Sequence, residues 1–587
     1  MLKSISGVVC SVLALVGCLD GGPQEGPGEI DSEASALHRA EEGVTFENVS
    51  ALLAPFARSA TGEGLGGIAW LDYDNDGNLD LYLTNGVGAS NGLFRNNGDG
   101  TFTDVTAAAG VSTAHPAIGA GSGASGVLAG DIDNDGFTDL FITGEGHLVG
   151  PAQTPNRMFH NQGNGSFQEI PAPSHPGSAL GASFGDINND GFVDLFVASP
   201  GHIPFLTGPG TGESHPNKLY LNNGDLTFTD ISASAGIEGL YPAPWDPGLT
   251  VSDGACVSGF TDYDQDGDAD LLVGNCNAWP PGGPAPVRPT PFNLFRNNGD
   301  NTFTDVAAAA GLATPPGGFW MGLAFGDYDN DGDVDFFATS TGTLNGLLHV
   351  LMSNNGDGTF TNNAAAAGVA SSEFGWGATM ADFDNDGDLD LYQVGSLPLF
   401  GAIGPGLGGP GRLNFNNGDG TFTDDTAATG VNLSFHYTSG VVQGDFDGDG
   451  FADIVVMTAP WQAVDPATGA VVGNPDGRPV LLRNEGNRNH SVTLKLVGTD
   501  SNAGGIGARV QVRTGWRVQT REVRAGSSMA STDSPWPSFG IGRWHHALVK
   551  VSWPSGLEER FFVRHGRVRT LTEGTGHRRR SHRGWRW

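Results

Sequence analysis

The chain contains little that favours helices. Only 4 of its 587 residues are lysine, whereas 93 are glycine and 34 are proline, and glycine and proline disfavour the interior of a helix. Short alanine-rich segments such as 107–109 and 307–310 are long enough for one helical turn and no more. A fold built from helices is therefore excluded, and we expect an all-β protein. Its length allows two or more domains with sizeable cores.

Motifs of common catalytic sites are also missing. The chain has no H-E-x-x-H pair and no glycine-rich phosphate loop after a strand. The string GGIGAR from Gly504 falls short of a dinucleotide fingerprint and lies among strand-like residues, where it predicts a bulge or turn. Catalytic side chains in the variable loops stay an alternative, because other enzymes share such scaffolds.

Aspartate, in contrast, is abundant and regularly spaced. Seven nonapeptides fit D-x-[DN]-x-D-G-x-x-D, and they start at Asp72, Asp131, Asp186, Asp262, Asp327, Asp382 and Asp445. Carboxylates at positions 1, 3 and 5 of a tight loop converge, glycine at position 6 permits the turn, and the position 7 carbonyl adds a backbone oxygen. Such oxygen sets suit Ca²⁺ better than Mg²⁺. Solvated acidic turns are the alternative, but four close carboxylates repel each other without a cation.

The predicted calcium ligands are positions 1, 3, 5, 7 and 9 of each loop, for up to seven Ca²⁺ ions. In the first four loops they are Asp72, Asp74, Asp76, Asn78, Asp80; Asp131, Asp133, Asp135, Phe137, Asp139; Asp186, Asn188, Asp190, Phe192, Asp194; and Asp262, Asp264, Asp266, Asp268, Asp270. In the last three they are Asp327, Asp329, Asp331, Asp333, Asp335; Asp382, Asp384, Asp386, Asp388, Asp390; and Asp445, Asp447, Asp449, Phe451, Asp453. Position 10 is always apolar and the flanks are strand-like, so each loop joins two strands rather than the helices of an EF-hand.

A second repeated element follows each loop and reads NGLFRNNGDGTFTDVTAAAG from Asn91. Apolar pairs around Asn-Asn-Gly-Asp predict a β-hairpin, so each unit supplies four short strands. Spacings of 55 to 76 residues between loops are typical of propeller blades. After the seventh loop the hairpin lacks its second strand, which residues 44–49 supply. We therefore expect a seven-bladed β-propeller over residues 43–486, closed by its N-terminal strand.

The loop and the TFTDVT hairpin together resemble the FG-GAP/VCBS repeat family, which includes the integrin-type propellers. Residues from about Asn489 to Phe562 carry GGIGARVQVRTGWRVQTREVRAGSSMASTDS, SFGIG and VKVSWPSG, and they resemble the ASPIC/UnbV domain. With both parts, the chain resembles the cartilage acidic protein family and its bacterial relatives over residues 43 to about 565. The resemblance implies an integrin-like β-propeller followed by a small β-domain at 487–570, and it defines fold far better than activity.

The first 18 residues are typical of an export signal. An apolar run from Ile5 to Val16 is too short to span a membrane and ends in Leu-Val-Gly-Cys at Cys18. This string resembles a bacterial lipobox, so we expect Cys18 to be lipidated; an ordinary signal peptide cleaved nearby is the alternative. No aspartate directly follows Cys18, which favours the outer membrane or cell surface. Residues 19–42 predict a flexible linker rich in glycine, proline and glutamate.

The two cysteines beyond the N-terminal segment flank the fourth loop. Cys256 lies six residues before Asp262, and Cys276 lies six residues after Asp270. Two strands joined by that loop bring these positions opposite each other. We therefore predict a cross-strand disulfide, which requires an oxidising compartment. A metal or catalytic role for the pair is the weaker alternative.

Charge divides the chain into two parts. Residues 1–486 hold 11 Lys/Arg against 59 Asp/Glu, whereas residues 487–587 hold 18 against 6, giving net charges of −48 and +12. The simplest interpretation is that the basic β-domain packs on the acidic propeller; binding to acidic glycans or lipid headgroups is an alternative. We expect residues 571–587 to form a basic disordered tail. The pair His545 and His546 is expected in a surface loop, with metal binding as the less favoured role.

Two functions remain open at this point. The favoured one is an exported, calcium-rigidified surface module that binds a protein or glycan, in an adhesion or scaffold role. Non-repeating loops such as 241–245 and 278–281 would form its recognition surface. The alternative is a secreted carbohydrate-active enzyme, a lyase or hydrolase, on the same scaffold. We expect no nucleic-acid partner, and membrane contact only through an N-terminal lipid anchor in the cell envelope.

Overall fold

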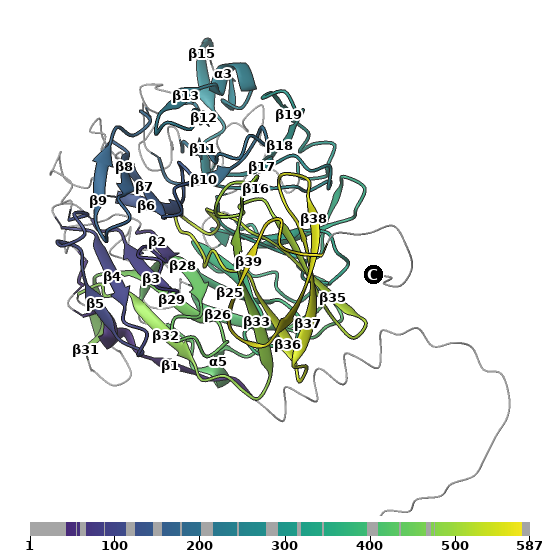
Figure 1. Ribbon diagram of the computed structural model, residues 1–587. Coiled ribbons are helices and arrows are strands. Elements are labelled where there is room, and N and C mark those ends of the chain that lie inside the picture. Colours follow the sequence, from purple (N-terminus) through teal and green to yellow (C-terminus); the bar gives the residue numbers. More distant parts are fainter. Residues whose placement is uncertain are drawn as a thin grey trace, which may run out of the picture.

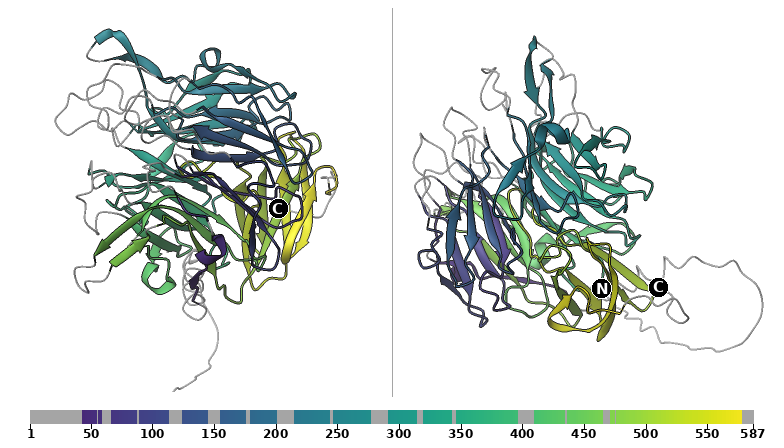
Figure 2. Two further views of the ribbon diagram at one scale, coloured as in Figure 1. Left: turned by 90° about the vertical axis from the view of Figure 1, so that its left-hand side faces the viewer. Right: turned by 45° about the horizontal axis from the view of Figure 1, so that its top comes forward.

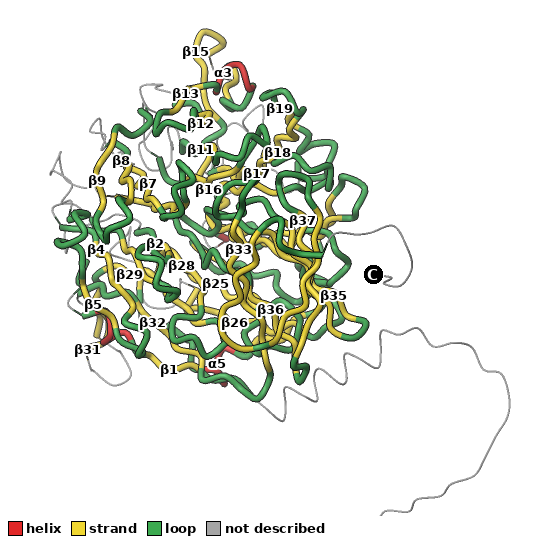
Figure 3. Tube along the Cα trace, in the orientation of Figure 1, coloured by secondary structure: helices red, strands yellow, loops and turns green. Residues whose placement is uncertain are grey.

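The computed structural model describes residues 43–577 except for 55, 59–65, 87–88, 113–123, 145–154, 176–178, 201–214, 244–245, 277–290, 314–318, 343–345, 396–408, 434–435, 465–470 and 475. The predicted export signal with Cys18, the 19–42 linker and tail residues 578–587 lie outside this part. The secondary structure within it is almost entirely strand (Figures 1 and 3). Its helices are single turns, namely η1 (Ser50–Leu53), α3 (Ser232–Ala235) and α5 (Thr426–Thr429).

Seven four-stranded antiparallel sheets, one for each acidic loop, fill the described residues from Phe46 to Asn484. The first four are β2 (Ile68–Leu71), β3 (Asp80–Leu83), β4 (Gly92–Asn96), β5 (Phe102–Asp104); β6 (Ala124–Gly130), β7 (Asp139–Gly144), β8 (Arg157–Asn161), β9 (Phe167–Ile170); β10 (Ala182–Gly185), β11 (Asp194–Val197), β12 (Lys218–Asn222), β13 (Phe228–Asp230); and β16 (Ala255–Thr261), β17 (Asp270–Asn275), β18 (Phe292–Asn297), β19 (Phe303–Asp305). The others are β20 (Trp320–Gly326), β21 (Asp335–Ser340), β22 (Val350–Asn354), β23 (Phe360–Asn362); β24 (Gly377–Ala381), β25 (Asp390–Gly395), β26 (Gly409–Asn416), β27 (Phe422–Asp424); and β28 (Tyr437–Gly444), β29 (Asp453–Ala459), β32 (Val480–Asn484), β1 (Phe46–Asn48).

The burial of the strands shows why each sheet is a propeller blade. The first two strands of a sheet, such as β2 and β3, are buried along their whole length, because neighbouring sheets cover both of their faces. The last strand begins with Phe and exposes the polar residues that follow it, as Thr103 and Asp104 do in β5. First strands contact each other in chain order from β2 to β28, and β28 contacts β2. The sheets therefore form a closed ring, and the predicted all-β propeller is confirmed.

Ring closure uses both ends of the propeller sequence, as predicted. Strand β1 pairs antiparallel with β32, so that Phe46 lies opposite Asn484 and Asn48 opposite Leu482. The last sheet thus has the order β1-β32-β29-β28. The missing hairpin strand comes from the N-terminal side of the chain, and the sheet has no unpaired edge at β32.

Two further hairpins extend from the end of the blades opposite the acidic loops. They are formed by β14 (Leu240–Ala243) with β15 (Asp246–Ser252), and by β30 (Trp461–Val464) with β31 (Val471–Asn474). The first follows the last strand of the third sheet and projects from the top of Figure 1. The predicted recognition stretch 241–245 overlaps this hairpin, although residues 244–245 and 278–281 lie outside the described residues.

The C-terminal domain consists of two packed sheets. One contains β35 (Arg517–Glu522), β34 (Arg509–Thr514), β37 (His546–Ser552) and β38 (Glu558–Arg564); the other contains β36 (Ser538–Gly542), β33 (His490–Val497) and β39 (Gly566–Thr572). Their inner faces share a core that also includes Phe141, Phe184 and Val193 of the propeller. The domain lies against one side of the ring (yellow in Figure 2). The two domains are therefore joined by a continuous hydrophobic core.

The ordered C-terminal domain extends further than the predicted boundary at residue 570. Strand β39 ends at Thr572, and the backbone of His577 exchanges hydrogen bonds with Arg560. Between them, one oxygen of the buried Glu573 accepts from the backbone N–H groups of Thr499, Asp500 and Ser501 at 2.8–2.9 Å. The other oxygen accepts from the hydroxyls of Ser501 and Ser555. The start of the predicted tail is thus a structural part of the domain.

We expect Glu573→Gln to lower the free energy of unfolding by about 2 kcal/mol at pH 7, because hydrogen bonds to a charged carboxylate are lost. Hydrogen bonds from Ser501 and Ser555 lower the pKa of Glu573 to about 2. A carboxyl with a lowered folded pKa stabilises the fold above its unfolded pKa, and this stabilisation is lost as the pH falls from about 4.5 to about 2. Urea unfolding at pH 7 and pH 3 measures both effects. The exposed Glu558→Gln, which loses an ion pair with Lys550, is the control.

Candidate metal centres

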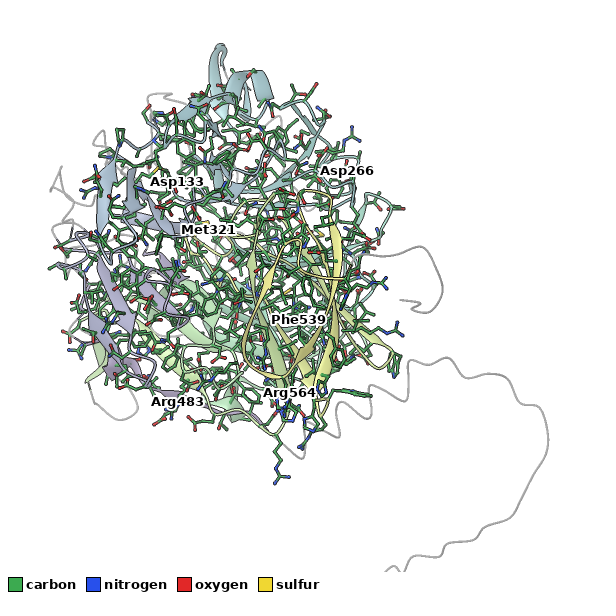
Figure 4. All side chains as sticks on the ribbon, viewed as in Figure 1. Asp133, Asp266, Met321, Arg483, Phe539 and Arg564 are labelled. Atoms are coloured by element: carbon green, nitrogen blue, oxygen red, sulfur yellow. A yellow bond between two sulfur atoms is a disulfide. The ribbon has the colours of Figure 1, made fainter. Side chains whose placement is uncertain are left out.

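Each acidic loop connects the first strand of a sheet to the second. Because the sheets are antiparallel and arranged in a ring, all seven loops lie at the same end of the propeller. Asp133 and Asp266, in the second and fourth loops, are labelled in Figure 4. The C-terminal domain contacts this end. The fold therefore gathers the predicted metal ligands at the end of the propeller that the C-terminal domain contacts.

The backbone conformation of the acidic loops explains which residues they contain. Position 4 has a left-handed backbone, with φ of 58° at Asn75, and is Asn, Gln or Gly in every loop. Position 6 is left-handed as well, with φ of 87° at Gly77, and glycine adopts this conformation without steric cost. The position 6 N–H donates to the position 1 carboxylate at 2.8–3.4 Å. The position 7 N–H donates to the position 5 carboxylate at 2.8–3.0 Å. These bonds hold the carboxylates together in one loop.

The predicted ligands at positions 1, 3, 5 and 9 converge in the structure. Ligand oxygens of Asp72, Asp74 and Asp80 lie within 4.8 Å of one another, as do those of Asp131, Asp133 and Asp135, and those of Asp262, Asp264 and Asp270. Several buried carboxylate oxygens have no hydrogen-bond partner among the described residues, namely Asp131 Oδ1, Asp262 Oδ1, Asp270 Oδ2 and Asp327 Oδ1. An unpaired buried carboxylate oxygen is costly. A hard divalent cation such as Ca²⁺ fits this donor set.

Position 9 has a second role that its spacing did not reveal. Its carboxylate is at most 1% exposed in every loop. One oxygen accepts from the backbone N–H of the Asn that opens the hairpin turn at 2.7–2.9 Å. In six loops the other oxygen accepts from the position 2 N–H, and in the fourth loop Asp270 Oδ2 is the unpaired atom. Position 9 thus joins the acidic loop to the hairpin of its own sheet.

The hairpin asparagine also joins neighbouring sheets, although the sequence suggests only a turn residue. Asn96 Nδ2 donates to the carbonyl of Phe446 in the last sheet at 2.6 Å. Every sheet repeats this bond to the position 2 carbonyl of the preceding loop, at 2.6–2.8 Å. The bond between the first and last sheets completes a circle. The signal in the sequence is the repetition of this Asn in all seven hairpins.

The side chain at position 4 links each loop to the next loop along the chain, whereas the hairpin asparagine bonds to the preceding loop. Asn75 donates to the carbonyl of Gly136 in the next loop at 2.8 Å, and Asn134 and Asn385 make the same bond. Where position 7 is Asp, its side chain is the acceptor, as for Asn330 and Asp388 at 2.7 Å. The three aspartates at position 7, namely Asp268, Asp333 and Asp388, therefore contribute side chains to loop-to-loop contacts. In the seventh loop position 4 is Gly448 and has no side chain to make such a link.

Cationic side chains of the C-terminal domain contact the loops, as the charge division predicts. Lys495 Nζ lies 2.8 Å from Asp72, and Arg517 lies 2.7 Å from Asp388. The guanidinium of Arg509 donates to the carbonyl of Gly332. Arg521 is half-buried near Asp382 and Asp327, and its desolvation lowers its pKa. In the second loop an imidazole of the propeller contacts the carboxylate, since His160 Nδ1 lies 3.1 Å from Asp139 Oδ1.

One segment of the C-terminal domain lies on the axis of the propeller. We call residues 525–534 the axial segment. It contacts the first strands of five sheets through hydrogen bonds that join Ala525 to Phe184, Ala530 to Val127, Thr532 to Ile68, Asp533 to Thr379 and Ser534 to Gln443. Met529 is fully buried in an apolar cluster with Leu180, Cys256, Cys276, Phe319, Met321, Phe374 and Trp376. The segment fills the centre of the ring.

The predicted disulfide is present next to this cluster. Cys256 and Cys276 are bonded, with Cα atoms 5.8 Å apart. Cys256 lies at an irregularity of β16, between Ala255 and Val257, and Cys276 follows the end of β17. The bond lies at the end of the blade opposite the acidic loop. It therefore fastens the fourth sheet where the non-repeating loops begin.

Burial raises the pKa of the position 9 carboxyls, to about 8 for Asp80 and Asp194 and about 9 for Asp270. A carboxyl with a raised folded pKa binds its proton more tightly in the folded protein. The metal-free protein is therefore expected to lose stability as the pH rises from about 4 to about 8. Calcium requires the ionised carboxyls, so in saturating Ca²⁺ the same rise increases stability. Melting curves at pH 5 and pH 8, with and without chelator, test this reversal; parallel trends would contradict it.

Known families and proteins match both domains. The FG-GAP-like repeat family matches residues 72–142, 146–197, 262–338 and 342–392, and the ASPIC and UnbV family matches residues 498–577. Cartilage acidic protein 1 of Mus musculus is 26% identical over 514 residues, covering 84% of this chain and 70% of the relative. The Homo sapiens protein of that name is 25% identical over 531 residues. Integrin alpha-V of Gallus gallus is 32% identical over 163 residues, which cover 25% of this chain and 14% of the integrin.

Two solved structures show a weaker likeness. The BP39L lectin from Burkholderia pseudomallei is 11% identical with a TM-score of 0.34, covering 87% of this chain and 97% of the lectin. The Dos1 propeller is 9% identical with a TM-score of 0.33, covering 82% and 97%. Neither likeness is close enough to indicate a shared ligand. The family matches and the long cartilage acidic protein alignments agree with the motifs, and the chain belongs to the FG-GAP-repeat proteins that carry a C-terminal ASPIC and UnbV domain.

Proposed function

We propose that this protein is an exported module that binds a protein or glycan outside the cell, on a propeller stiffened by up to seven Ca²⁺ ions. The observation that carries the proposal is the repeated acidic loop, whose carboxylates converge into an oxygen donor set suited to calcium, as in the first, second and fourth loops. Extracellular calcium concentrations keep sites of modest affinity filled. The disulfide at Cys256–Cys276 supports export, because such bonds persist in oxidising compartments. Lipidation at Cys18 would place the module on the cell envelope.

The calcium ions are proposed as structural parts rather than as a switch. Carboxylates at positions 1, 3, 5 and 9 and the carbonyl of position 7 would hold each ion. Bound calcium neutralises charges that burial otherwise makes costly. Position 9 of a loop is bonded to the hairpin of its own sheet, and position 4 is bonded to the loop of the next sheet. Filling a loop therefore stabilises the contact between two blades.

The ligand surface is proposed at the end of the ring opposite the acidic loops. The C-terminal domain covers the loop end through Lys495, Arg509 and Arg517. The β14–β15 hairpin lies at the other end, where loop sequence and length differ from blade to blade. Such loops on a rigid ring are suited to recognition.

A pull-down with the mature protein from native envelope or matrix fractions tests the proposal, together with a glycan array. The comparison uses wild type and a variant in which a two-residue turn replaces residues 242–250 at the tip of the hairpin. We expect a bound protein or glycan that the hairpin variant retains at least tenfold less, and that chelation releases. Equal retention by both proteins would show that the ligand-binding surface does not include the hairpin. Turnover of the captured glycan to shortened or unsaturated products would instead establish an enzyme.

A further inference from the structure

We infer that His490, His545 and His565 form a transition-metal site on the C-terminal domain, separate from the acidic loops. Their ligand-competent nitrogens all lie within 4.8 Å of one another. His545 Nδ1 and His565 Nε2 are 3.2 Å apart. The ring centroids of the three imidazoles are 4.0–5.1 Å apart. Residues distant in sequence thus meet at one point.

The fold positions each histidine through backbone contacts. His490 is the first residue of β33 and pairs with Gly542 of β36. His545 directly precedes β37, and His565 lies between β38 and β39. The His565 N–H donates to the His545 carbonyl at 3.1 Å, which fixes these two residues relative to each other. The site is therefore built at an edge where both sheets of the domain meet.

The donor set selects the class of metal. Imidazole nitrogens suit Zn²⁺, Cu²⁺ and Ni²⁺, whereas Ca²⁺ takes oxygen ligands. A tetrahedral zinc with Zn–N bonds of about 2.0–2.1 Å separates its ligand nitrogens by about 3.3 Å. The separation between His545 and His565 is already close to this value, at 3.2 Å. His490 and His565 are half-buried and His545 is exposed, so an ion can enter from solvent.

Neighbouring charges shape the open coordination position. Arg543 lies near His490, and Arg564 lies near His565. Neutral imidazole is the form that binds metal. Three protein ligands leave the fourth position of a tetrahedral ion open. The positive charges of the arginines repel a bare metal ion but attract an anion that is bound to it. The fourth ligand is therefore a carboxylate or small anion from solvent or a partner. Arg564 is labelled at the edge of the domain in Figure 4.

His546 gives the site its matched control. It adjoins His545 in sequence, but its ring stacks on Phe562 at 5.1 Å rather than joining the cluster. The sequence predicts a surface loop for both residues. The structure separates them, because β37 begins at His546 and its side chain lies with the outer face of β38.

Titration of the full mature protein with Zn²⁺ in excess Ca²⁺ tests the inference. We expect one tight equivalent of zinc, a Co²⁺-substituted form with the intense visible bands of a tetrahedral site, and at least 100-fold weaker binding in His545→Ala and in His490→Ala. His546→Ala should bind as wild type does. His160→Ala controls for the second loop and should also bind normally.

Absence of a zinc equivalent in wild type would overturn the inference, as would undiminished binding in both cluster variants. Zinc uptake that His160→Ala abolishes would assign the metal to the second acidic loop instead. Circular dichroism of each variant confirms that it is folded. The outcome is independent of the calcium proposal, because the acidic loops stay filled with Ca²⁺ throughout.

Discussion

Chelation of calcium is expected to lower the melting temperature of the protein by about 10 °C. A ligand at about ten times its dissociation constant stabilises the folded state by about 1.4 kcal/mol per site, and the sequence has seven loops. The sum over the seven loops is about 10 kcal/mol. The shift in melting temperature is this free energy divided by the unfolding entropy, which is large for a chain of this length. Differential scanning calorimetry with EDTA, and then with added Ca²⁺, measures it. An unchanged melting temperature would refute a structural role for calcium.

Single loops provide the control for this experiment. Asp262→Ala removes a position 1 carboxylate with an unpaired buried oxygen and should reduce bound calcium by one equivalent. Asp264→Asn should keep that equivalent, because the third loop already carries Asn188 at the same position. Elemental analysis of the purified proteins distinguishes the two. Equal calcium content in both variants would show that the fourth loop holds no ion.

Met529→Asp is expected to lower the free energy of unfolding by about 4 kcal/mol or more. Met529 is fully buried within the axial segment, where an aspartate would be an unpaired buried charge. Because the segment bonds to the first strands of five sheets, the loss should loosen both the ring and its contact with the C-terminal domain. Urea unfolding and limited proteolysis report the two effects.

Met529→Leu is the matched control, since it keeps an apolar side chain of similar volume. We expect it to cost less than about 1.5 kcal/mol. If Met529→Asp were as stable as Met529→Leu, the axial segment would not be packed in the ring in solution. Separate unfolding transitions for the two domains in Met529→Asp, but one in wild type, would show that the segment couples them.

The regular parts of this structure could be predicted because each follows from local chemistry. The acidic loop shows its glycine and carboxylate spacing, and the hairpin shows its Asn-Gly turn between apolar pairs. Even the closure of the ring follows locally, because one strand is missing after Val480 and one is in excess before the first loop. The cysteine pair follows from equal spacing around a loop between paired strands.

The remaining features depend on burial that no local pattern records. The axial segment reads Ala-Gly-Ser-Ser-Met-Ala-Ser-Thr-Asp-Ser and resembles a polar surface loop, yet the ring surrounds it. Glu573 lies in a stretch with the composition of a tail, and backbone N–H groups 72 to 74 residues earlier bind it. The three clustered histidines are 20 to 75 residues apart in sequence. Only the packing of the two sheets brings them together.

The closure of the ring by β1 has a mechanical consequence. Any force applied to the chain before residue 43 reaches the propeller through three residue pairs between β1 and β32. One side-chain link crosses this seam, the ion pair between Arg483 of β32 and Glu47 of β1. A protein tethered at its N-terminus would therefore bear load first at the joint that completes its circle, the pairing of β1 with β32.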